Sequence, residues 1–442
     1  MGLFGTDGVR GPAGFGILGA DGALRLGAAF VDALEPEHGR LAIARDTRRS
    51  GAMLAAAVTA GALARGWDVL DLGVIPTPGL SWVLSQEEDL AGGVMITASH
   101  NPAADNGLKL FAAGGGKVSD SLQEAVEARF AALSNGLPDG SDIGERRDGS
   151  DRMGRWLDSM PQGGLSGRRI VADSACGAGH RALPAALSAC GAEVVVMNPA
   201  PDGLNINDGC GAVHPEQLAR RVQSEGAWAG VALDGDGDRI ALVDEQGVVH
   251  DGDAILGFLA KAMRGEGTLR GGAVAGTVTT NSGLGRFLSN LDLGLVRTPV
   301  GDRHVAAALQ ERGLNLGGES SGHILTPDLC PSGDAIRVAL EVLRRIEGPV
   351  SAALGGVPRD PSAKRSVRVG DRPALESVPG LAAVMAEAEQ ALTAAGARQL
   401  LRYSGTEPLL RIQVEGPDRD LVEQWADRLA AAARESLPGP SA

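Results

Sequence analysis

Residues 229–239 read Ala-Gly-Val-Ala-Leu-Asp-Gly-Asp-Gly-Asp-Arg. The first half is an apolar run of the length of a buried strand, and it stops at three carboxylates, Asp234, Asp236 and Asp238. Short apolar runs of this kind recur along the chain and alternate with segments of helical periodicity. That alternation indicates an α/β fold, in which the loops at the carboxyl ends of the strands build the site.

The same pattern appears before and after this stretch. Near the N-terminus, strands are expected over Leu41–Ala44, Trp67–Leu72 and Gly93–Thr97, with an Ala-rich helix over Gly51–Ala64. The further expected strands are Ile170–Asp173, Glu193–Met197, Ala229–Leu233, Ala273–Thr277 and Gly294–Arg297, and the expected late helices are Leu381–Ala394 and Asp420 to about Arg434. The sequence therefore predicts three similar mixed α/β units and a smaller C-terminal α+β unit.

Two stretches indicate where these units meet. Residues 135–150 are rich in Gly, Asp and Ser, and residues 358–365 form a basic segment with prolines, which is typical of a linker. We expect four domains at residues 1–150, 151–252, 253–360 and 361–442. A chain of 442 residues is also too long for one compact core.

Composition narrows the class of function. The net charge of −14 repels polyanions, so nucleic-acid and anionic-membrane partners are disfavoured, while a small phosphorylated substrate in a locally basic pocket is not. No apolar run reaches the roughly 20 residues that span a bilayer, and the N-terminus lacks the charged start and long apolar stretch of a secretory signal. The four cysteines are scattered and form no Cys-x-x-Cys pair, which favours a reduced, cytoplasmic protein.

The acidic loop predicts a divalent-metal site. Asp234, Asp236 and Asp238 would repel one another unless a cation lay among them, and hard oxygen ligands suit Mg²⁺. The competing interpretations are a solvated acidic turn and an EF-hand. Glu245 does occupy position twelve of an EF-hand loop, but position six is Arg239 instead of Gly, and strands flank the loop instead of helices.

A second motif, residues 97–102, reads Thr-Ala-Ser-His-Asn-Pro after another apolar run. The apolar run predicts Ser99 in an exposed loop at a strand end. Pro102 stops that strand from continuing, because proline fixes φ and offers no N–H. Ser99 could act there as a nucleophile, or the segment could be an ordinary Ser/Asn turn. A hydrolase pair with His100 is disfavoured, since adjacent strand residues point to opposite faces and no Gly-x-Ser-x-Gly elbow is present.

Two later loops also carry polar side chains that could bind a substrate. Residues 317–323, Gly-Gly-Glu-Ser-Ser-Gly-His, could bracket adjacent sugar hydroxyls, and His323 could exchange protons near neutral pH. Residues 402–408, Arg-Tyr-Ser-Gly-Thr-Glu-Pro, could form an anion-binding turn, to which Arg402 and Arg411 add bidentate phosphate donors. Taken alone, each loop could equally be a polar turn.

Together these motifs resemble the α-D-phosphohexomutase family, and within it the bacterial phosphoglucosamine mutases. The resemblance runs from Phe4 to about Gly416 with the motifs in the same order. It also includes residues 4–11 (Phe-Gly-Thr-Asp-Gly-Val-Arg-Gly), residues 202–207 (Asp-Gly-Leu-Asn-Ile-Asn) and residues 300–303 (Val-Gly-Asp-Arg). It implies four domains around one central cleft and the interconversion of glucosamine 6-phosphate and glucosamine 1-phosphate.

The resemblance also implies roles for individual residues. Ser99 would be the phosphorylated serine, and its phosphate would ligate Mg²⁺ together with Asp234, Asp236 and Asp238. The implied proton-transfer and charge-stabilising residues are Lys109 and His323, with Arg10 and Arg239 near the phosphoserine. The implied substrate contacts are Glu319 and Ser321 for sugar hydroxyls, and Arg402, Ser404, Gly405, Thr406 and Arg411 for the non-reacting phosphate.

The implied small molecules are a hexosamine phosphate as substrate and a hexose bisphosphate as activator and intermediate. A homodimer is one possible assembly. Ser320 stands where many of these mutases have Gln or Asn, and His304 where Tyr is common, so hexose preference stays open. The alternatives are a phosphoglucomutase or phosphomannomutase, a metal-dependent sugar phosphatase, or a sugar-phosphate-binding regulator without turnover.

Overall fold

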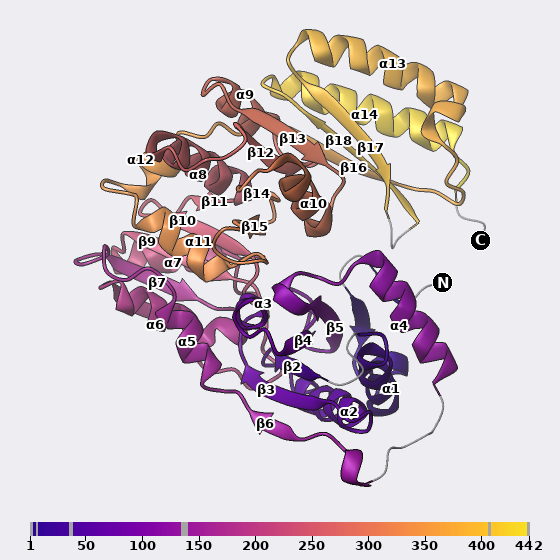
Figure 1. The fold of residues 1–442 in the computed structure, drawn as a ribbon. Coiled ribbons are helices and arrows are strands. Elements are labelled where there is room, and N and C mark those ends of the chain that lie inside the picture. Colours follow the sequence, from indigo (N-terminus) through magenta and orange to yellow (C-terminus); the bar gives the residue numbers. More distant parts are fainter. Residues whose placement is uncertain (1–2, 6–7, 35–38, 134–139, 405–407, 440–442) are drawn as a thin grey trace.

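The computed structural model describes residues 3–5, 8–34, 39–133, 140–404 and 408–439. It contains four sheets arranged in chain order, and the first three units form an arc to which the fourth is attached at one end (Figure 1). The predicted class is confirmed: three mixed α/β units are followed by a smaller α+β unit. Within these ranges, no helix is long and apolar enough to cross a membrane.

The first unit is built on a sheet of order β1-β5-β4-β2-β3-β6. Strands β2, β3, β4 and β6 run parallel, whereas β1 and β5 are antiparallel to their neighbours. The elements are β1 Val9–Pro12, η1 Gly16–Leu18, α1 Ala20–Val31, β2 Arg40–Arg45, α2 Gly51–Leu63, β3 Asp68–Val74, α3 Thr77–Gln86, β4 Leu90–Ile96, β5 Asp105–Ala112, η2 Ala113–Gly115, α4 Asp120–Ala132, η3 Gly140–Asp142, β6 Arg146–Asp148 and α5 Arg152–Asp158.

The second and third units repeat the layering with smaller sheets, of order β11-β10-β9-β7-β8 and β13-β12-β14-β15. The second contains β7 Arg169–Asp173, η4 Ala178–His180, α6 Ala182–Ala189, β8 Glu193–Met197, α7 Glu216–Glu225, β9 Ala229–Leu233, β10 Ile240–Asp244 and β11 Val249–His250. The third contains α8 Gly252–Glu266, β12 Ala273–Thr277, α9 Ser282–Ser289, β13 Gly294–Thr298, α10 Asp302–Arg312, β14 Gly317–Gly318, β15 Ile324–Leu325, α11 Ala335–Leu343 and α12 Val350–Leu354.

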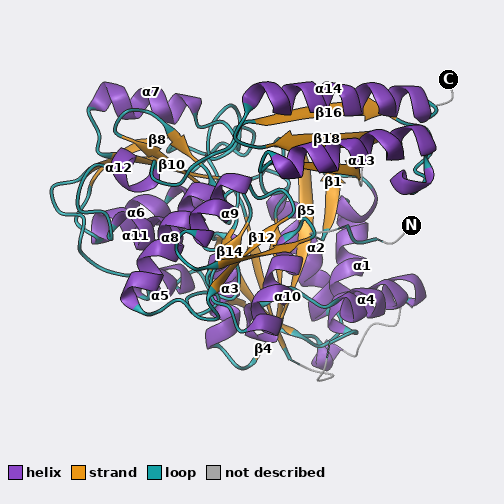
Figure 2. Cartoon of the chain, turned by 90° about the horizontal axis from the view of Figure 1, so that it is seen from above, coloured by secondary structure: helices purple, strands orange, loops and turns teal. Residues whose placement is uncertain are grey.

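The fourth unit is a three-stranded antiparallel sheet of order β16-β18-β17. Its elements are β16 Ser362–Arg368, η5 Leu375–Ser377, α13 Pro379–Ala394, β17 Arg398–Tyr403, β18 Leu409–Glu415 and α14 Arg419–Ser436. Figure 2 shows α13 and α14 running alongside the strands of this sheet. The apolar face of the sheet is thereby covered within the unit itself.

The hydrophobic core explains how the units are joined. One continuous cluster of buried side chains runs through the first three units and includes Trp156, Leu183, Leu256 and Ile336. The fourth unit has a separate core of its own, centred on residues such as Trp425. Because apolar burial dominates the stability of packed units, the first three should behave as one body and the fourth as an appended one.

Most predicted elements are present, with two departures. The expected linker at residues 358–365 is wrong in its second half, because β16 begins at Ser362 and pairs along its whole length with β18. Its alternate residues Ala363 and Val367 are buried, whereas Lys364 faces outward from the strand. Arg365 lies on the same face as the buried residues, is half-buried, and pairs with Glu423 and Asp427 of α14. The predicted boundary stretch contributes β6, which extends the first sheet beside β3.

Candidate active site

Ser99 lies three residues beyond the end of β4, in a loop with unusual backbone geometry. Its φ is 50°, in the left-handed region that few residues other than glycine adopt. The Ser99 N–H donates to Oγ1 of Thr97 over 2.8 Å. The expectation of an exposed serine is wrong: Ser99 is only 1% exposed, because the acidic loop of the second unit covers it.

Arg48 holds this loop from its buried side. Its guanidinium donates to the carbonyl oxygens of Ser99 over 2.9 Å and Asn101 over 2.8 Å, and also to those of Pro102 and Asp105. Its Nε donates to Asp46 over 2.9 Å. Asn207 of the second unit reaches the same Ser99 and Asn101 carbonyls over 2.8 and 3.1 Å. The left-handed serine is therefore fixed by donors from two units.

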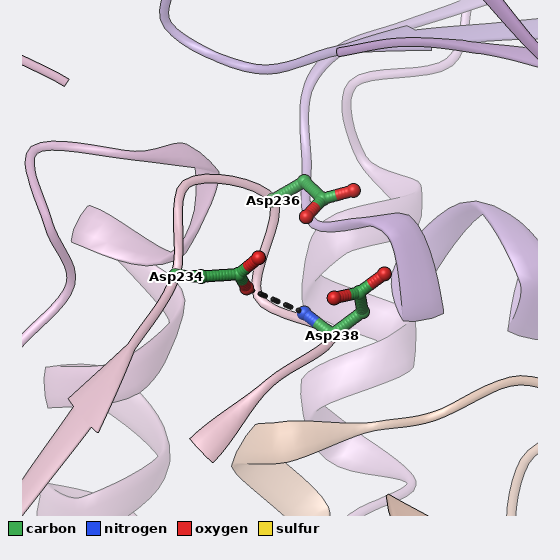
Figure 3. Close-up of side chains that lie close together, drawn as sticks. All are labelled: Asp234, Asp236 and Asp238. Atoms are coloured by element: carbon green, nitrogen blue, oxygen red, sulfur yellow. Dashed lines mark hydrogen bonds between the residues drawn. The ribbon is translucent and has the colours of Figure 1, made fainter. Parts of the chain in front are cut away.

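The acidic loop follows β9, and Figure 3 shows how its three carboxylates, Asp234, Asp236 and Asp238, lie close together. Asp234 Oδ2 accepts a hydrogen bond of 2.6 Å from Ser99 Oγ. The opposite oxygen, Oδ1, accepts from the N–H groups of Asp238 over 3.2 Å and Arg239 over 3.1 Å. Gly235 is required for this approach, since a Cβ there would lie 2.5 Å from the Ser99 carbonyl oxygen.

Lys109 partly neutralises the negative charge of the loop, and Thr77 donates a further hydrogen bond to it. Asp236 Oδ2 accepts from Lys109 Nζ over 2.8 Å and from Thr77 Oγ1 over 2.6 Å, and Lys109 Nζ also lies 3.3 Å from Asp238. Burial and the neighbouring carboxylates raise the pKa of Asp234 well above its usual value. Burial also opposes ionisation of Asp238, but Lys109 and His323 outweigh it and hold the pKa of Asp238 well below its usual value.

Some oxygens of these carboxylates accept no hydrogen bond from the described residues and could bind a cation. One oxygen from each of Asp234, Asp236 and Asp238 lies within 4.8 Å of the others, and all three side chains are buried. The Oδ1 atoms of Asp236 and Asp238 accept no hydrogen bond from any residue that the structure describes. Buried, unsatisfied carboxylate oxygens are costly unless a cation binds them. The donor set fits a divalent metal with oxygen ligands.

The third unit reaches the same cluster through His323. The imidazole is 5% exposed, with Nδ1 3.6 Å from Asp238 Oδ1 and Nε2 3.4 Å from Asp302 Oδ2. Burial opposes its positive charge, but these two carboxylates outweigh burial and raise the pKa of His323. In the same loop, Glu319 accepts from the Gly301 N–H over 3.1 Å, whereas Ser321 is exposed.

Two arginines act electrostatically on His100, the residue that follows Ser99. Arg10 lies in β1, opposite Gly107 of β5, and Arg239 closes the acidic loop. Burial, Arg239 and Arg10 together lower the pKa of His100 to about 4. His100 Nδ1 lies 3.4 Å from Ser99 Oγ, because the left-handed turn removes the alternation that would separate neighbours in a strand. Positive charge therefore acts at His100, beside the serine.

The fourth unit carries the predicted phosphate residues. Arg402 in β17 lies directly opposite Arg411 in β18, and burial together with Arg411 lowers the pKa of Arg402. Like charges opposite each other destabilise a sheet unless an anion compensates them. Ser404 is buried at the end of β17, which points toward the first unit (Figure 1), and Gly405 and Thr406 lie outside the described residues.

The structure thus brings Ser99, Lys109, the three aspartates and His323 into one connected cluster from three units. Arg402, Ser404 and Arg411 lie in the fourth unit. Sequence reasoning missed four residues of the cluster's support, namely Arg48, Thr77, Asn207 and Asp302. Arg48 and Thr77 follow strands β2 and β3, so their position at strand ends was the available signal.

Comparison with known families covers nearly the whole chain. Residues 1–136, 158–247, 251–354 and 366–432 match, in that order, domain I, domain II, domain III and the C-terminal domain of phosphoglucomutase/phosphomannomutase. The matched segments correspond to the four sheets of the structure.

Individual relatives agree with this assignment. The chain is 42% identical to a phosphoglucosamine mutase of Symbiobacterium thermophilum, over 98% of this chain and 99% of that protein. It is 44% identical to one of Rhodospirillum rubrum, over 97% of each chain. The crystal structure of a phosphoglucomutase/phosphomannomutase family protein from Burkholderia thailandensis superposes with a TM-score of 0.82 at 24% identity, covering 99% of this chain and 98% of the other.

Proposed function

The chain belongs to the phosphoglucomutase/phosphomannomutase family, and we propose that it interconverts glucosamine 6-phosphate and glucosamine 1-phosphate through a phosphate carried on Ser99. It is an intramolecular phosphotransferase of the isomerase type. The amino-sugar substrate is supported by relatives over 40% identical across nearly their whole length, which carry the name phosphoglucosamine mutase.

The observation that carries the proposal is the 2.6 Å contact between Ser99 Oγ and Asp234. It places a buried hydroxyl against a cluster of three carboxylates that can hold a metal. Neither a turn nor a simple sugar-binding pocket needs this combination. A phosphorylated Ser99 would supply a further oxygen ligand beside Asp234, Asp236 and Asp238, and we assign Mg²⁺ to that site. When bound, the metal supplies charge neutralisation at the transferred phosphoryl group.

Several residues of this chain then take part in the transfer of the phosphoryl group from Ser99 to the sugar. The Ser99 Oγ–P bond breaks while a bond forms between phosphorus and the free 1- or 6-hydroxyl oxygen of the sugar, so a bisphosphate results. Lys109, whose ammonium lies between Asp236 and Asp238, stabilises the negative charge of the phosphoryl group during its transfer. His323, in its neutral form, accepts the proton of the sugar hydroxyl. Arg10 and Arg239 hold the phosphoryl oxygens.

The second phosphoryl transfer runs in the opposite direction, from the sugar back to Ser99. The bisphosphate turns end for end in the cleft, and its other phosphate returns to Ser99, which leaves the isomeric monophosphate. Glu319 and Ser321 bind sugar hydroxyls, while Arg402, Ser404, Gly405, Thr406 and Arg411 grip the phosphate that does not react. Because the fourth unit has its own core, it can open between the two steps without disrupting the other three.

The domains take matching roles in this scheme. Residues 1–150 carry the phosphoserine, residues 151–252 the metal ligands, residues 253–360 the sugar contacts, and residues 361–442 the phosphate contacts. A trace of hexose bisphosphate would start the cycle by phosphorylating Ser99.

The test is a comparison of isomerisation rates for glucosamine 6-phosphate, glucose 6-phosphate and mannose 6-phosphate, with Mg²⁺ and a trace of glucose 1,6-bisphosphate. We expect the amino sugar to be turned over with the highest kcat/KM. A preference for glucose or mannose would refute the substrate assignment while keeping the phosphoserine scheme. Steady release of inorganic phosphate without isomerisation would refute the mutase assignment in favour of a phosphatase.

A further inference from the structure

A cavity lined by several basic side chains lies apart from the catalytic cluster, between the first and second units. Its volume is about 700 Å³, which is within the range of small-molecule sites. It lies beside the carboxyl ends of β2 and β3 and beside η4, where ligands of parallel sheets commonly bind. None of Asp234, Asp236, Asp238, Lys109 or His323 lines it.

The wall of the cavity has a concentration of positive charge. Arg45, Arg49 and Arg181 line it, and their side chains form no hydrogen bond or ion pair with any residue in the described part of the chain. His180 lies beside Arg181. The only carboxylate among the lining residues is Asp202, whose Oδ1 accepts the N–H groups of the two residues after Gly203.

The lack of ion pairs at these three arginines contrasts with many arginines elsewhere in the described chain. The chain has 55 acidic and 41 basic residues, so carboxylate partners for arginine are plentiful. Elsewhere arginines are paired in this way, for example Arg286 with Asp360 and Arg345 with Glu266. Three guanidinium groups around one cavity that are not paired with a carboxylate leave donors that match the oxygens of a phosphate.

Part of the wall is apolar. Leu72, Val74, Met153 and Pro201 line the cavity alongside the arginines. Inorganic phosphate would leave most of this volume and the apolar wall unused. An anion that also carries an organic portion would fill both.

We propose that this cavity binds an organic phosphate with at least two negative charges, of the size and chemistry of a nucleoside diphosphate. The ligand's phosphates contact Arg45, Arg49 and Arg181, and its organic portion lies against Leu72 and Met153. The site also adjoins the loop of Ser99, because Arg48 lines the cavity and donates to the Ser99 carbonyl.

The probe for this site is ADP, with inorganic pyrophosphate as the comparison, titrated calorimetrically into the full chain. We expect ADP to bind the unaltered protein, and the double variant Arg49→Ala/Arg181→Ala to bind it at least ten-fold more weakly, since the variant lacks two charge-assisted phosphate contacts. Both arginines are exposed, so the variant should fold and keep its basal turnover. Arg220→Ala, an exposed arginine on α7, is the matched control and should bind ADP normally.

Three results would overturn the proposal. Equal ADP affinity in the double variant and the control would exclude these arginines as the site. Loss of ADP binding in Arg402→Ala instead would place the anion in the catalytic cleft. Pyrophosphate binding as tight as that of ADP would refute the role of the apolar wall.

Discussion

The guanidinium of Arg48 donates a hydrogen bond of 2.9 Å to the carbonyl oxygen of Ser99, and both residues are 1% exposed. The same group also binds the carbonyl of Asn101, so it fixes the turn that presents the serine hydroxyl to Asp234. Arg48 touches no reacting atom in this arrangement. It is a positioning residue for the left-handed conformation of Ser99.

We therefore expect Arg48→Lys to lower kcat at least ten-fold with little change in KM. Lysine keeps the charge beside Asp46, but a single ammonium cannot reach the several carbonyls that the planar fork binds. Steady-state kinetics on the purified variant check this, with Arg220→Lys as the control. A rise in KM alone would show that Arg48 acts on substrate binding and not on the serine loop.

Metal binding should stabilise the protein through the acidic loop. Mg²⁺ added after EDTA treatment should raise the melting temperature, because a ligand that binds only the folded state stabilises it by mass action. Asp234→Asn should abolish both this shift and turnover, while Asp158→Asn, an exposed aspartate on α5, should keep both. An unchanged shift in Asp234→Asn would mean that the metal binds elsewhere.

The opposed arginines of the fourth unit should control substrate affinity. Arg411→Ala should raise KM for the sugar phosphate about 10–100-fold, since it removes a charge-assisted phosphate contact. Initial-rate kinetics on the variant and on the unaltered chain test this effect. A lower KM would contradict the assignment of the phosphate site.

Asp253 should give the stability a distinct pH dependence. Burial, followed by the nearby Asp251, raises the pKa of Asp253 to about 7, and its Oδ2 accepts the Asn281 N–H over 2.9 Å. In the unfolded chain this carboxyl titrates near 4. Between about pH 4 and pH 7 the folded state therefore holds a proton that the unfolded state has lost, so this group's contribution to stability falls as pH rises.

Asp253→Asn retains an oxygen acceptor but cannot ionise. The variant should gain melting temperature relative to the unaltered chain at pH 8, and gain much less or nothing at pH 5. Melting curves at the two pH values, with Asp158→Asn as a control on the surface, measure the difference. A gain of equal size at both values would show that ionisation of Asp253 is not the cause.

The sequence predicted the strands of the buried sheets well, because each is a compact apolar run that ends at a polar loop. Strands β8, β9 and β12 have the bounds expected from Glu193–Met197, Ala229–Leu233 and Ala273–Thr277. Strand β16 was obscured, since Ser, Lys and Arg occupy its exposed positions and only Ala363 and Val367 are buried. Edge strands of small sheets carry this weaker pattern.

The site residues divide in a similar way. Asp234, Asp236 and Asp238 were predictable because their chemistry lies within one short loop. The contacts that Arg48 and Asn207 make were not predictable, since their partners Ser99 and Asn101 are 51 to 108 residues away along the chain. The burial of Ser99 was also unpredictable, because the residues that cover it come from a different unit.

The central claim is that Ser99 carries the phosphate that is transferred. Intact-protein and peptide mass spectrometry should find a phosphate on Ser99 after incubation with glucose 1,6-bisphosphate and Mg²⁺, and Ser99→Ala should lose both that phosphate and isomerisation of glucosamine 6-phosphate. Isomerisation that continues in Ser99→Ala at the rate of the unaltered chain would contradict the account.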